Sequence, residues 1–475
     1  MQGNNSKTFQ INENLTLQLS ILVLITIVAG ILRFYKLGEW SFWIDEIATL
    51  NRAQASMREL LTVVPTGLSY ILTNISLRTF GLSEWSSRLV STLLGILTIP
   101  VIFFPIKAMF DAKSSLIAVL LIAISPWHLF WSQSARFYTS LMLFYFLAMF
   151  AFYYGLEKDR FWYIILGIVF FLIAFQERML SLLLIPVLII YILSVKWFSF
   201  ETPKGFRVKN FLPLIVVGLV GMLFVIFDIY QYASSGSSII MNKMDWFIKN
   251  PIDDPFRLLV FTFLSISIPI GILALLSGGY LILEKSRPGL YLIIGAFIPL
   301  ILTLLANPFM FTKERYLFMT FPCWAILAAV GIKEIFSRSK GNARLLAWGV
   351  LLMLVVTAAV TQLLYFTVNH GNRYDWESVF TLVQERQHED DVVVSTRPQI
   401  GAYYYDGTIK IYSRMTPEII AENNRNYWFI VDSEKVWDNR EMKDWLEKKA
   451  VLTDFQYLRL PEELNLRVYH YAPGN

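Results

Sequence analysis

Two adjacent carboxylates, Asp45 and Glu46, come shortly after the first apolar run of the chain, with aromatic residues at positions 40, 42 and 43 just before them. An apolar, partly dry setting raises the pKa of a carboxyl group and makes its anion a better proton acceptor. The pair can therefore supply a general base. An acidic pair that opens a helix, where the macrodipole favours negative charge, is an equally weighted alternative.

A second set of candidates lies in residues 125–138, which contain His128, Arg136 and Tyr138 together with further aromatic residues. An arginine can bind a phosphate through two hydrogen bonds, and an aromatic ring can stack on a sugar. The simpler interpretation of this segment alone is an aromatic belt at a membrane surface, with a snorkelling arginine and a hydrogen-bonded interfacial histidine.

A third set lies in residues 307–316, where Lys313, Arg315 and Tyr316 precede another apolar run. The two cations can clamp an anion, and an ion pair with Glu314 is the alternative. Arg88, near the start of the second apolar run, is a further candidate cation. Carboxylates, cations and aromatic rings at lipid level suit group transfer from a lipid-borne phosphate donor.

The elements that position these residues are membrane helices. The chain is 56% hydrophobic and only 16% charged, against about 25% charged residues in soluble domains. Its apolar runs have the length that crosses a bilayer and lack the alternation of barrel strands. We predict eleven transmembrane helices, at residues 17–35, 86–107, 115–132, 137–156, 161–176, 180–196, 210–230, 258–283, 289–306, 316–333 and 344–366.

The distribution of charge predicts the orientation of these helices. With the N-terminus in the cytoplasm, the loops that face inward hold 14 basic residues, and the outward loops after residue 110 hold 7. The positive-inside rule therefore places the candidate site and the C-terminal tail outside the plasma (inner) membrane. We interpret the first apolar run as a retained helix rather than a cleaved signal peptide, because no small-residue cleavage site follows it.

The chain divides into two predicted domains. Residues 1–369 form the transmembrane domain, with interfacial helices in the long first outward loop, residues 36–85. Residues 370–475 hold 13 basic and 18 acidic residues and alternate strand and helix signals, which indicates a small extracytoplasmic α/β domain. The expected strands begin near residues 392, 409, 427 and 466, and the expected helices cover residues 379–386, 417–422 and 440–449.

Several classes of function are excluded or unsupported. The tail has no glycine-rich phosphate fingerprint and no Ser-His-Asp or zinc-ligand spacing, so we expect no second active site there. No basic patch on a soluble face indicates a nucleic-acid partner. The single cysteine, Cys323, lies in a predicted span and excludes a disulfide framework.

Four pieces of the chain resemble the GT-C class of integral membrane glycosyltransferases, in particular the branch of the protein O-mannosyltransferases and the lipid A aminoarabinose transferase. They are residues 32–38 leading to residues 43–46, residues 80–89, residues 125–138, and residues 315–317 with Pro322. Their order and sidedness cover most of the membrane part. The tail, at residues 373–377 and 391–394, is more loosely similar to the extracytoplasmic appendage of bacterial members.

The resemblance implies a polyprenyl-phosphate sugar donor, an acceptor that is a glycan, lipid or protein of the cell envelope, and inversion at the anomeric carbon. It implies that Asp45 is the catalytic base, with Glu46 as its neighbour, and that Arg136 and Arg315 meet the donor phosphate. Relatives often have an acidic residue where Ser134 stands here, so a bound divalent metal stays an open question and no cofactor is assigned.

Two hypotheses from other classes compete with a glycosyltransferase. A flippase or transporter of lipid-linked sugars would carry ionisable residues or helix breaks at mid-membrane depth, whereas the charges here cluster at one rim. A membrane anchor that displays the tail as a binding module explains neither the eleven spans nor the Asp45–Glu46 pair. We therefore predict an enzyme, with Asp45 as its general base.

Overall fold

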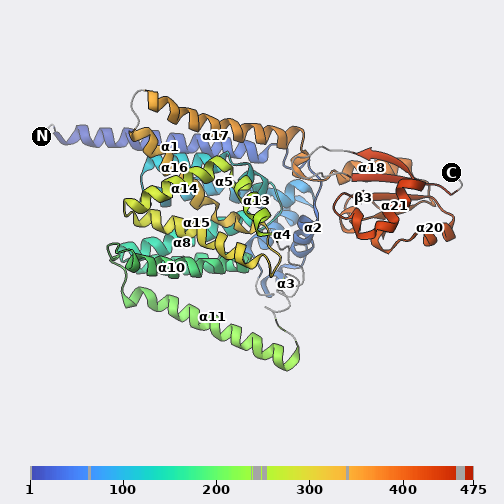
Figure 1. Cartoon of the computed structure of the whole chain (residues 1–475), viewed down its shortest axis with the longest axis horizontal. Coiled ribbons are helices and arrows are strands. Elements are labelled where there is room, and N and C mark those ends of the chain that lie inside the picture. Colours follow the sequence, from blue (N-terminus) through green and yellow to red (C-terminus); the bar gives the residue numbers. More distant parts are fainter. Residues whose placement is uncertain are drawn as a thin grey trace.

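A computed structural model of the chain describes residues 3–62, 66–236, 238, 248, 254–338, 342–455 and 466–473. Figure 1 shows helices that run side by side along the long axis of the molecule, with a domain that contains a β-sheet at one end. The helices α2 (Ile44–Ala53), α3 (Met57–Thr62) and α4 (Leu68–Phe80) lie at the same end of the bundle as this domain.

The membrane part consists of long apolar helices, as predicted. Eight of the described helices can cross a membrane by length and composition, and up to ten spans result if each of two bent helix pairs counts as one. The long elements are α1 (Gly3–Phe34), α5 (Glu84–Met109), α8 (Tyr138–Lys158), η1 (Met179–Leu183) with α10 (Leu184–Trp197), α11 (Val208–Ser235), α15 (Arg287–Ala306), η2 (Glu314–Thr320) with α16 (Phe321–Arg338), and α17 (Asn342–Thr367).

The remaining predicted spans are two bent pairs and one shorter helix. The bent pairs are α6 (Ala112–Ala123) with α7 (Pro126–Ser132), and α13 (Pro255–Ile266) with α14 (Ile268–Leu283). The run predicted at residues 161–176 forms α9 (Phe161–Glu177), an apolar helix of 17 residues. The predicted fold class, a polytopic α-helical membrane protein, is confirmed.

Both bends have local causes. At the first, α6 ends and Pro126 opens α7, because proline has no N–H and cannot continue a helical ladder; Ser125 caps the new helix by accepting from the His128 amide at 3.3 Å. The two axes meet at 61°. At the second, Ser267 has a φ of +82°, Pro269 follows, and the axes meet at 94°.

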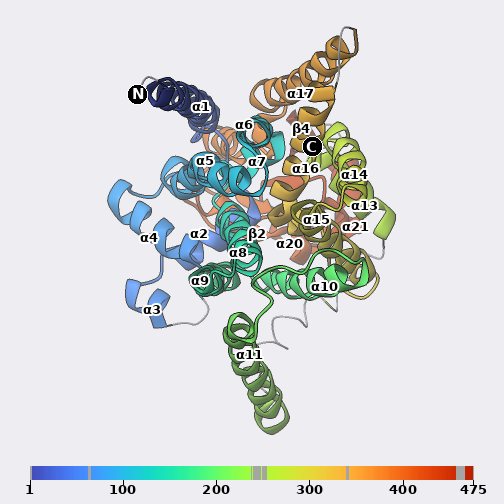
Figure 2. The same ribbon diagram turned by 90° about the vertical axis from the view of Figure 1, so that its left-hand side faces the viewer.

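Burial separates the centre of the bundle from its lipid-facing rim. Most of α8 and α16 is buried, whereas the apolar side chains of α1, α11 and α17 are mostly exposed. Figure 2, which looks along the bundle, shows these three helices on its outside. Exposed apolar surface on whole helices is what contact with lipid requires, so these helices form the outer layer in the membrane.

The predicted interfacial helices of the first long loop are present as α2 (Ile44–Ala53), α3 (Met57–Thr62) and α4 (Leu68–Phe80). Asp45 and Glu46 both lie in the first turn of α2, the position in the alternative interpretation of the pair. Glu46 Oε2 accepts a hydrogen bond from the Trp43 amide at 3.4 Å and so helps to start the helix.

The C-terminal domain has a five-stranded sheet in the order β2-β1-β3-β5-β4. β1 pairs in parallel with β2 and β3, and β5 pairs antiparallel with β3 and β4. Its strands are β1 (Val392–Ser395), β2 (Ile409–Ile411), β3 (Tyr427–Asp432), β4 (Val451–Phe455) and β5 (Leu466–Tyr471). Its helices are α18 (Trp376–Arg386), α19 (Pro398–Gly401), α20 (Pro417–Asn423) and α21 (Arg440–Lys449), with 3₁₀ turns η3 (His370–Asn372), η4 (Tyr412–Arg414) and η5 (Val436–Asn439).

The four predicted strands and three predicted helices of this domain are found, whereas β4 was not predicted. β4 is an edge strand of five residues that begins two residues after α21 ends, and its sequence, VLTDF, has no apolar alternation. The segment pairs with β5 in tertiary contact, which a local pattern does not reveal.

The C-terminal domain packs directly on the first loop. One apolar cluster contains Phe42, Ile47 and Leu50 from the loop together with Trp376 and Phe380 from α18. Hydrogen bonds of Tyr404 and Glu377 to the membrane domain reinforce this contact.

Tyr404 hydrogen-bonds to both parts of the membrane domain that face it. Its hydroxyl accepts from the Phe42 amide at 2.7 Å and donates to Glu84 Oε1 at 2.5 Å. The Glu377 amide of α18 donates to Ser41 Oγ at 3.1 Å. The C-terminal domain is therefore part of the surroundings of α2, the helix that carries Asp45.

Candidate active site

Asp45 lies at the centre of the candidate site. Its Oδ2 is 3.1 Å from Arg315 Nη1, so η2 and α2 meet at this ion pair. Arg136 Nη1 donates to the backbone carbonyl of Asp45 at 2.5 Å and to Thr49 Oγ1 at 2.9 Å. The Asp45 side chain remains 28% exposed, so its carboxylate is held in place and is still accessible.

The turn that carries Arg136 is fixed by α5. Thr92 Oγ1 donates to the carbonyl of Ser132 at 2.9 Å, and Ser91 Oγ donates to the carbonyl of Arg136 at 2.9 Å. Gln133 Nε2 donates to the carbonyl of Tyr35 at 2.7 Å, which ties the same turn to the end of α1. These bonds hold Arg136 next to α2 although the two segments are 91 residues apart in sequence.

Aromatic rings flank the cations of the site. The guanidinium of Arg136 lies 5.0 Å from the centre of the Phe137 ring, and that of Arg178 lies 4.4 Å from the same ring. The Arg315 guanidinium lies 5.8 Å from the Trp43 ring and 5.9 Å from the Tyr316 ring. Rings attract a cation and leave its N–H groups free for an anion.

Positive charge exceeds negative charge in this cluster. Asp45 is paired with Arg315, but within the described residues neither Arg136 nor Arg178 forms an ion pair with a carboxylate. The Nε atoms of Arg136 and Arg315 are buried without a hydrogen-bond partner in the described part of the chain. Buried guanidinium N–H groups without partners are costly, so the arrangement is suited to an anionic ligand.

Glu46, the neighbour of Asp45, has different surroundings. It is fully buried, and its two oxygens lie 2.9 Å from Nε and Nη2 of Arg88. The Ala135 amide donates to Oε1 at 2.8 Å, and Arg373 Nε lies 3.5 Å from Oε2. Burial raises the pKa of the Glu46 carboxyl, but the charges of Arg88 and Arg373 and the hydrogen bonds together hold that pKa well below its usual range.

Arg88 is buried with its carboxylate partner and bonds the loop before α2. Its Nη1 donates to the carbonyls of Leu37, at 3.2 Å, and Trp40, at 2.8 Å, and its Nη2 donates to the carbonyl of Ser41 at 3.2 Å. The structure therefore places Arg88 behind α2, with its guanidinium N–H groups directed at Glu46 and at three loop carbonyls rather than at the side of Asp45.

The remaining predicted residues divide into two groups. Tyr138 is buried against Trp131, with 4.0 Å between ring centres, and Tyr316 lies beside Arg315, so both belong to the walls of the Asp45 site. His128 is fully buried, with Nδ1 2.7 Å from Arg33 Nη2, and is part of a cluster inside the bundle. Lys313 is half-buried, with its Nζ 5.7 Å from the Phe311 ring.

The described residues offer no convincing metal centre. No group of three or more His, Cys, Asp or Glu side chains converges within them. Ser134, at the position where relatives often have an acidic residue, accepts a hydrogen bond from Arg373 Nη2 at 2.7 Å. Ser134 therefore bonds a cation at the position where a metal ion would need a carboxylate, and the residues present do not fit a bound metal.

Two arginines of this region were not among the predicted site residues. Arg178 follows α9 and is exposed, and Arg373 precedes α18 and is buried. A signal for Arg178 was present, because it is one of the outward basic residues that oppose the positive-inside rule, as Arg136 and Arg315 are. Arg373 comes from the segment before the C-terminal domain, and no local pattern links it to Glu46.

The chain is similar to known proteins in family and in fold. Residues 64–227 match the model of a family described as dolichyl-phosphate-mannose-protein mannosyltransferase. A search of curated proteins gave no sequence match. Solved structures with a similar fold include ArnT from Cupriavidus metallidurans, in the apo state and bound to undecaprenyl phosphate, each with a TM-score of 0.57 and 12% identity.

The apo ArnT comparison covers 97% of this chain and 98% of ArnT, and the undecaprenyl phosphate complex covers 95% and 98%. The archaeal oligosaccharyltransferase AglB from Archaeoglobus fulgidus, in complex with an inhibitory peptide and a dolichol-phosphate, matches with a TM-score of 0.57 and 12% identity, over 94% of this chain and 74% of AglB. The family match covers residues 64–227, and the fold shared with ArnT and AglB extends over most of the chain.

Proposed function

We propose that this protein transfers a sugar from a polyprenyl-phosphate-linked donor to an extracytoplasmic acceptor, a glycan, lipid or protein, with Asp45 as general base. The observation that carries the proposal is the accessible Asp45 carboxylate, which lies among arginines whose charge exceeds its own. A base for the acceptor and cations for a phosphate leaving group are the two requirements of this reaction.

The steps of the reaction balance with these residues. Asp45 accepts the proton of an acceptor hydroxyl or amine, and the deprotonated atom bonds to the anomeric carbon. The bond between that carbon and the phosphate oxygen breaks, and the electron pair leaves with polyprenyl phosphate. Attack from the face opposite the leaving group inverts the anomeric centre. Arg136, Arg178 and Arg315 stabilise the negative charge that develops on the phosphate.

Arg315 has two partners in this scheme. Without a donor it pairs with Asp45 at 3.1 Å. A bound phosphate competes for its guanidinium, and the carboxylate of Asp45 then becomes free to accept a proton. The half-buried ring of Tyr316 lies beside Arg315 and offers a surface for the sugar, whereas the ring of Tyr138 is 2% exposed and packs against Trp131. Lys313 is a further candidate cation, and Arg88 with Glu46 fixes the loop that carries the base.

The membrane supplies the lipid part of the donor. The exposed apolar helices α1, α11 and α17 surround the bundle, and a polyprenyl chain remains in the lipid next to them. Support comes from two relatives in fold, ArnT with undecaprenyl phosphate and AglB with dolichol-phosphate. The excess of basic residues in the opposite loops supports placing Asp45 and residues 370–475 outside the plasma (inner) membrane, with residues 1–369 as the membrane domain.

The test compares the wild type with Asp45→Asn, both purified in detergent. Each is incubated with a panel of polyprenyl-phosphate sugars, and the release of polyprenyl phosphate is followed by mass spectrometry. A general base contributes about 10²–10⁴ in rate, so we expect the variant to lose release by that factor. Glu39→Gln is the matched control, because Glu39 is an acid of the same loop whose side chain is 56% exposed and paired with Lys36.

Equal rates of polyprenyl phosphate release by the wild type and Asp45→Asn would show that Asp45 is not the general base. Absence of release by the wild type with every donor, in the presence of glycan, lipid and peptide acceptors, would contradict the proposed reaction.

A further inference from the structure

An open cavity of about 520 Å³ lies at the surface, at the junction of the first loop and the C-terminal domain, and most of its lining residues are exposed. Helix α2 contributes Ile47, Asn51 and Gln54 to its wall, and Leu82 from the segment before α5 adds an apolar side chain. The other wall comes from the C-terminal domain, through three residues of α19 and the turn after it: Gln399, Ala402 and Tyr403. This volume is within the range of small-ligand sites in proteins, about 300–1,000 Å³.

The lining of this cavity is polar but carries no charge. Asn51, Gln54 and Gln399 present side-chain amides, which both donate and accept hydrogen bonds. Tyr403 donates to Asn51 Oδ1 at 3.2 Å and accepts from Gln54 Nε2 at 3.5 Å. These bonds use the oxygen of Asn51 and one donor of Gln54, so the nitrogen of Asn51, the oxygen of Gln54 and the exposed amide of Gln399 are available to a ligand.

The ring of Tyr403 is fixed in this wall. It meets the Phe42 ring edge to face, with 5.5 Å between ring centres, and its exposed part borders the cavity beside Ile47 and Leu82. A pyranose ring presents hydroxyl groups and apolar C–H faces. The amides of the cavity wall can hydrogen-bond to the hydroxyl groups, and its apolar side chains can pack against the C–H faces. An anion would require cations in the wall, and a metal ion would require carboxylates.

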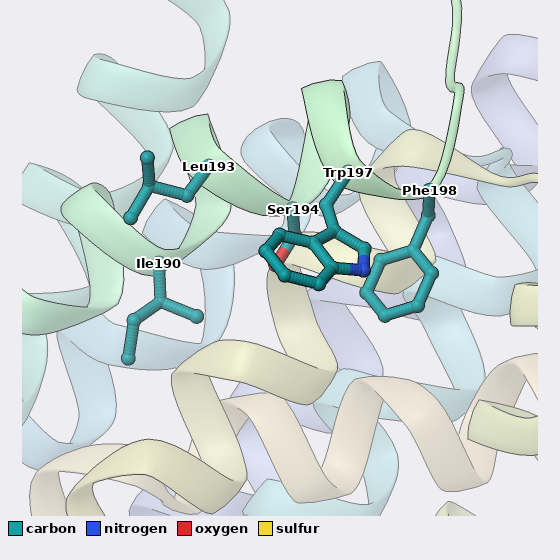
Figure 3. Close-up of a pocket in the computed structure, with 5 residues that line it drawn as sticks. All are labelled: Ile190, Leu193, Ser194, Trp197 and Phe198. Atoms are coloured by element: carbon teal, nitrogen blue, oxygen red, sulfur yellow. The ribbon is translucent and has the colours of Figure 1, made fainter.

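A second cavity gives the contrast. It measures about 170 Å³ and lies on α10, with Ile190, Leu193, Ser194, Trp197 and Phe198 in its wall (Figure 3). All five residues come from one helix and the residue after it, and their side chains offer one hydroxyl and one indole N–H for directional recognition. The cavity at the domain junction combines two domains and three amides, and it is therefore the better candidate for specific binding.

The position of the junction cavity relative to Asp45 follows from helix geometry. Successive residues of an α-helix are rotated by about 100°, so Asp45 and Thr49 share one face of α2. Ile47, Asn51 and Gln54 lie on the opposite face. The two sites are therefore separated by the width of one helix, about 10 Å. A ligand in the cavity does not reach the reacting atoms, whereas a longer molecule that crosses α2 at its exposed residue, Ala48, reaches both.

The sheet topology explains why the C-terminal domain provides this wall. Strand β1 lies between β2 and β3 and is parallel to both, and two residues connect β1 to α19. Ligands of such sheets bind at the carboxyl ends of the strands, where the strand order changes direction. This edge holds α19, which faces α2 through Tyr403.

We propose that the cavity between α2 and α19 binds the non-reacting sugar residues of an oligosaccharide acceptor, while the reacting end of that acceptor lies at Asp45. This inference rests on the proposed function and narrows its acceptor to a glycan. Binding energy from remote sugars then contributes to the reaction at Asp45. It also gives the C-terminal domain a direct role in the choice of acceptor.

The test measures glycan binding by the full-length protein in detergent, without any donor, on an array of immobilised neutral oligosaccharides. We expect the wild type to bind members of the array and Ala402→Trp, which fills the cavity, to lose at least tenfold in affinity. Ala421→Trp is the matched control, because Ala421 is an exposed alanine of α20 in the same domain and outside the cavity. Gln399→Ala removes one amide without adding bulk and is expected to weaken binding about five- to tenfold.

Absence of binding by the wild type to every neutral oligosaccharide, or equal binding by Ala402→Trp and Ala421→Trp, would overturn the proposal. Binding to a parallel peptide array that Ala402→Trp abolishes would assign the cavity to a polypeptide and would overturn the saccharide assignment. Failure of the proposed function has a separate readout, since the wild type would then release no polyprenyl phosphate from any donor, whereas the array contains no donor.

Discussion

Asp45 and Glu46 are neighbours in sequence and share the first turn of α2, yet they have opposite surroundings. Asp45 is 28% exposed and has one ion-pair partner, whereas Glu46 is fully buried and has two arginines and a backbone amide. A rotation of about 100° along the helix separates the two side chains. The exposed Asp45 carboxylate can therefore react with a ligand, whereas the buried Glu46 carboxylate holds helix α2 in position.

The arginines around the two carboxylates differ in the same way. Those near Glu46 find acceptors for the N–H groups that the carboxylate does not use: Arg88 bonds three loop carbonyls, and Arg373 bonds the carbonyls of Gln133 and Gly371. Near Asp45, Arg136 and Arg315 each have a buried Nε without a hydrogen-bond partner in the described residues; the Nε of Arg373 also lacks one, but it lies 3.5 Å from the carboxylate of Glu46. Two regions with similar residue types are therefore a closed cluster and an open site, and only the open one is suited to an anion.

The largest expected effect on the closed cluster comes from Glu46→Ala. Removing one partner of a buried ion pair leaves the other charge uncompensated and costs about 3–5 kcal/mol. We expect a clearly lower apparent Tm in detergent, measured by thermal unfolding. Glu39→Ala serves as control, since the Glu39–Lys36 pair is exposed and such pairs contribute about 0–1 kcal/mol. An equal Tm for the two variants would contradict the structural role of Glu46.

A smaller effect is expected in the open site from Arg178→Ala. The Arg178 side chain is exposed and stacks on Phe137 beside Arg136, so its loss removes one of three cations near the phosphate without opening a buried cavity. We expect about a tenfold higher KM for the donor and an unchanged apparent Tm. Arg58→Ala, an exposed arginine of α3, is the control. A variant with the wild-type KM would exclude Arg178 from the donor site.

The smallest effect concerns pH. The pKa of Glu46 in the folded protein lies below its value in the unfolded chain, about 4.3. Its stabilising contribution is therefore complete above that value and is lost as the pH falls toward the pKa of the folded protein. We expect the Tm difference between the wild type and Glu46→Gln to be constant from about pH 7 to pH 5.5 and to shrink below about pH 4. A difference that grows on acidification would contradict the sign of this shift.

The sequence predicted the membrane architecture well, because each span is an apolar run whose signal is local. It also indicated Asp45, Arg136 and Arg315, because the distribution of basic residues places the loops that carry them on the same side of the membrane. The structure brings these three residues into contact. Their catalytic roles stay predictions that the experiments above address.

The sequence could not separate the roles of Asp45 and Glu46. The partner of Glu46 on α5, Arg88, is 42 residues away, and Arg373 comes from the segment before the C-terminal domain. Two adjacent acids in one aromatic segment have the same local pattern, and only tertiary contact decides which one is buried. For the same reason Arg88 was expected at the donor, and the structure places it behind α2 with Glu46.

The most direct test of the account measures apparent Tm and single-turnover release of polyprenyl phosphate for Asp45→Asn and Glu46→Gln side by side. We expect Asp45→Asn to keep the wild-type Tm and to lose about 10²–10⁴ in rate. We expect Glu46→Gln to have a lower Tm, and its folded fraction to react within about tenfold of the wild-type rate. The opposite pattern, a folded Glu46→Gln protein without turnover and an active Asp45→Asn protein, would show that the base is Glu46 and that the account is wrong.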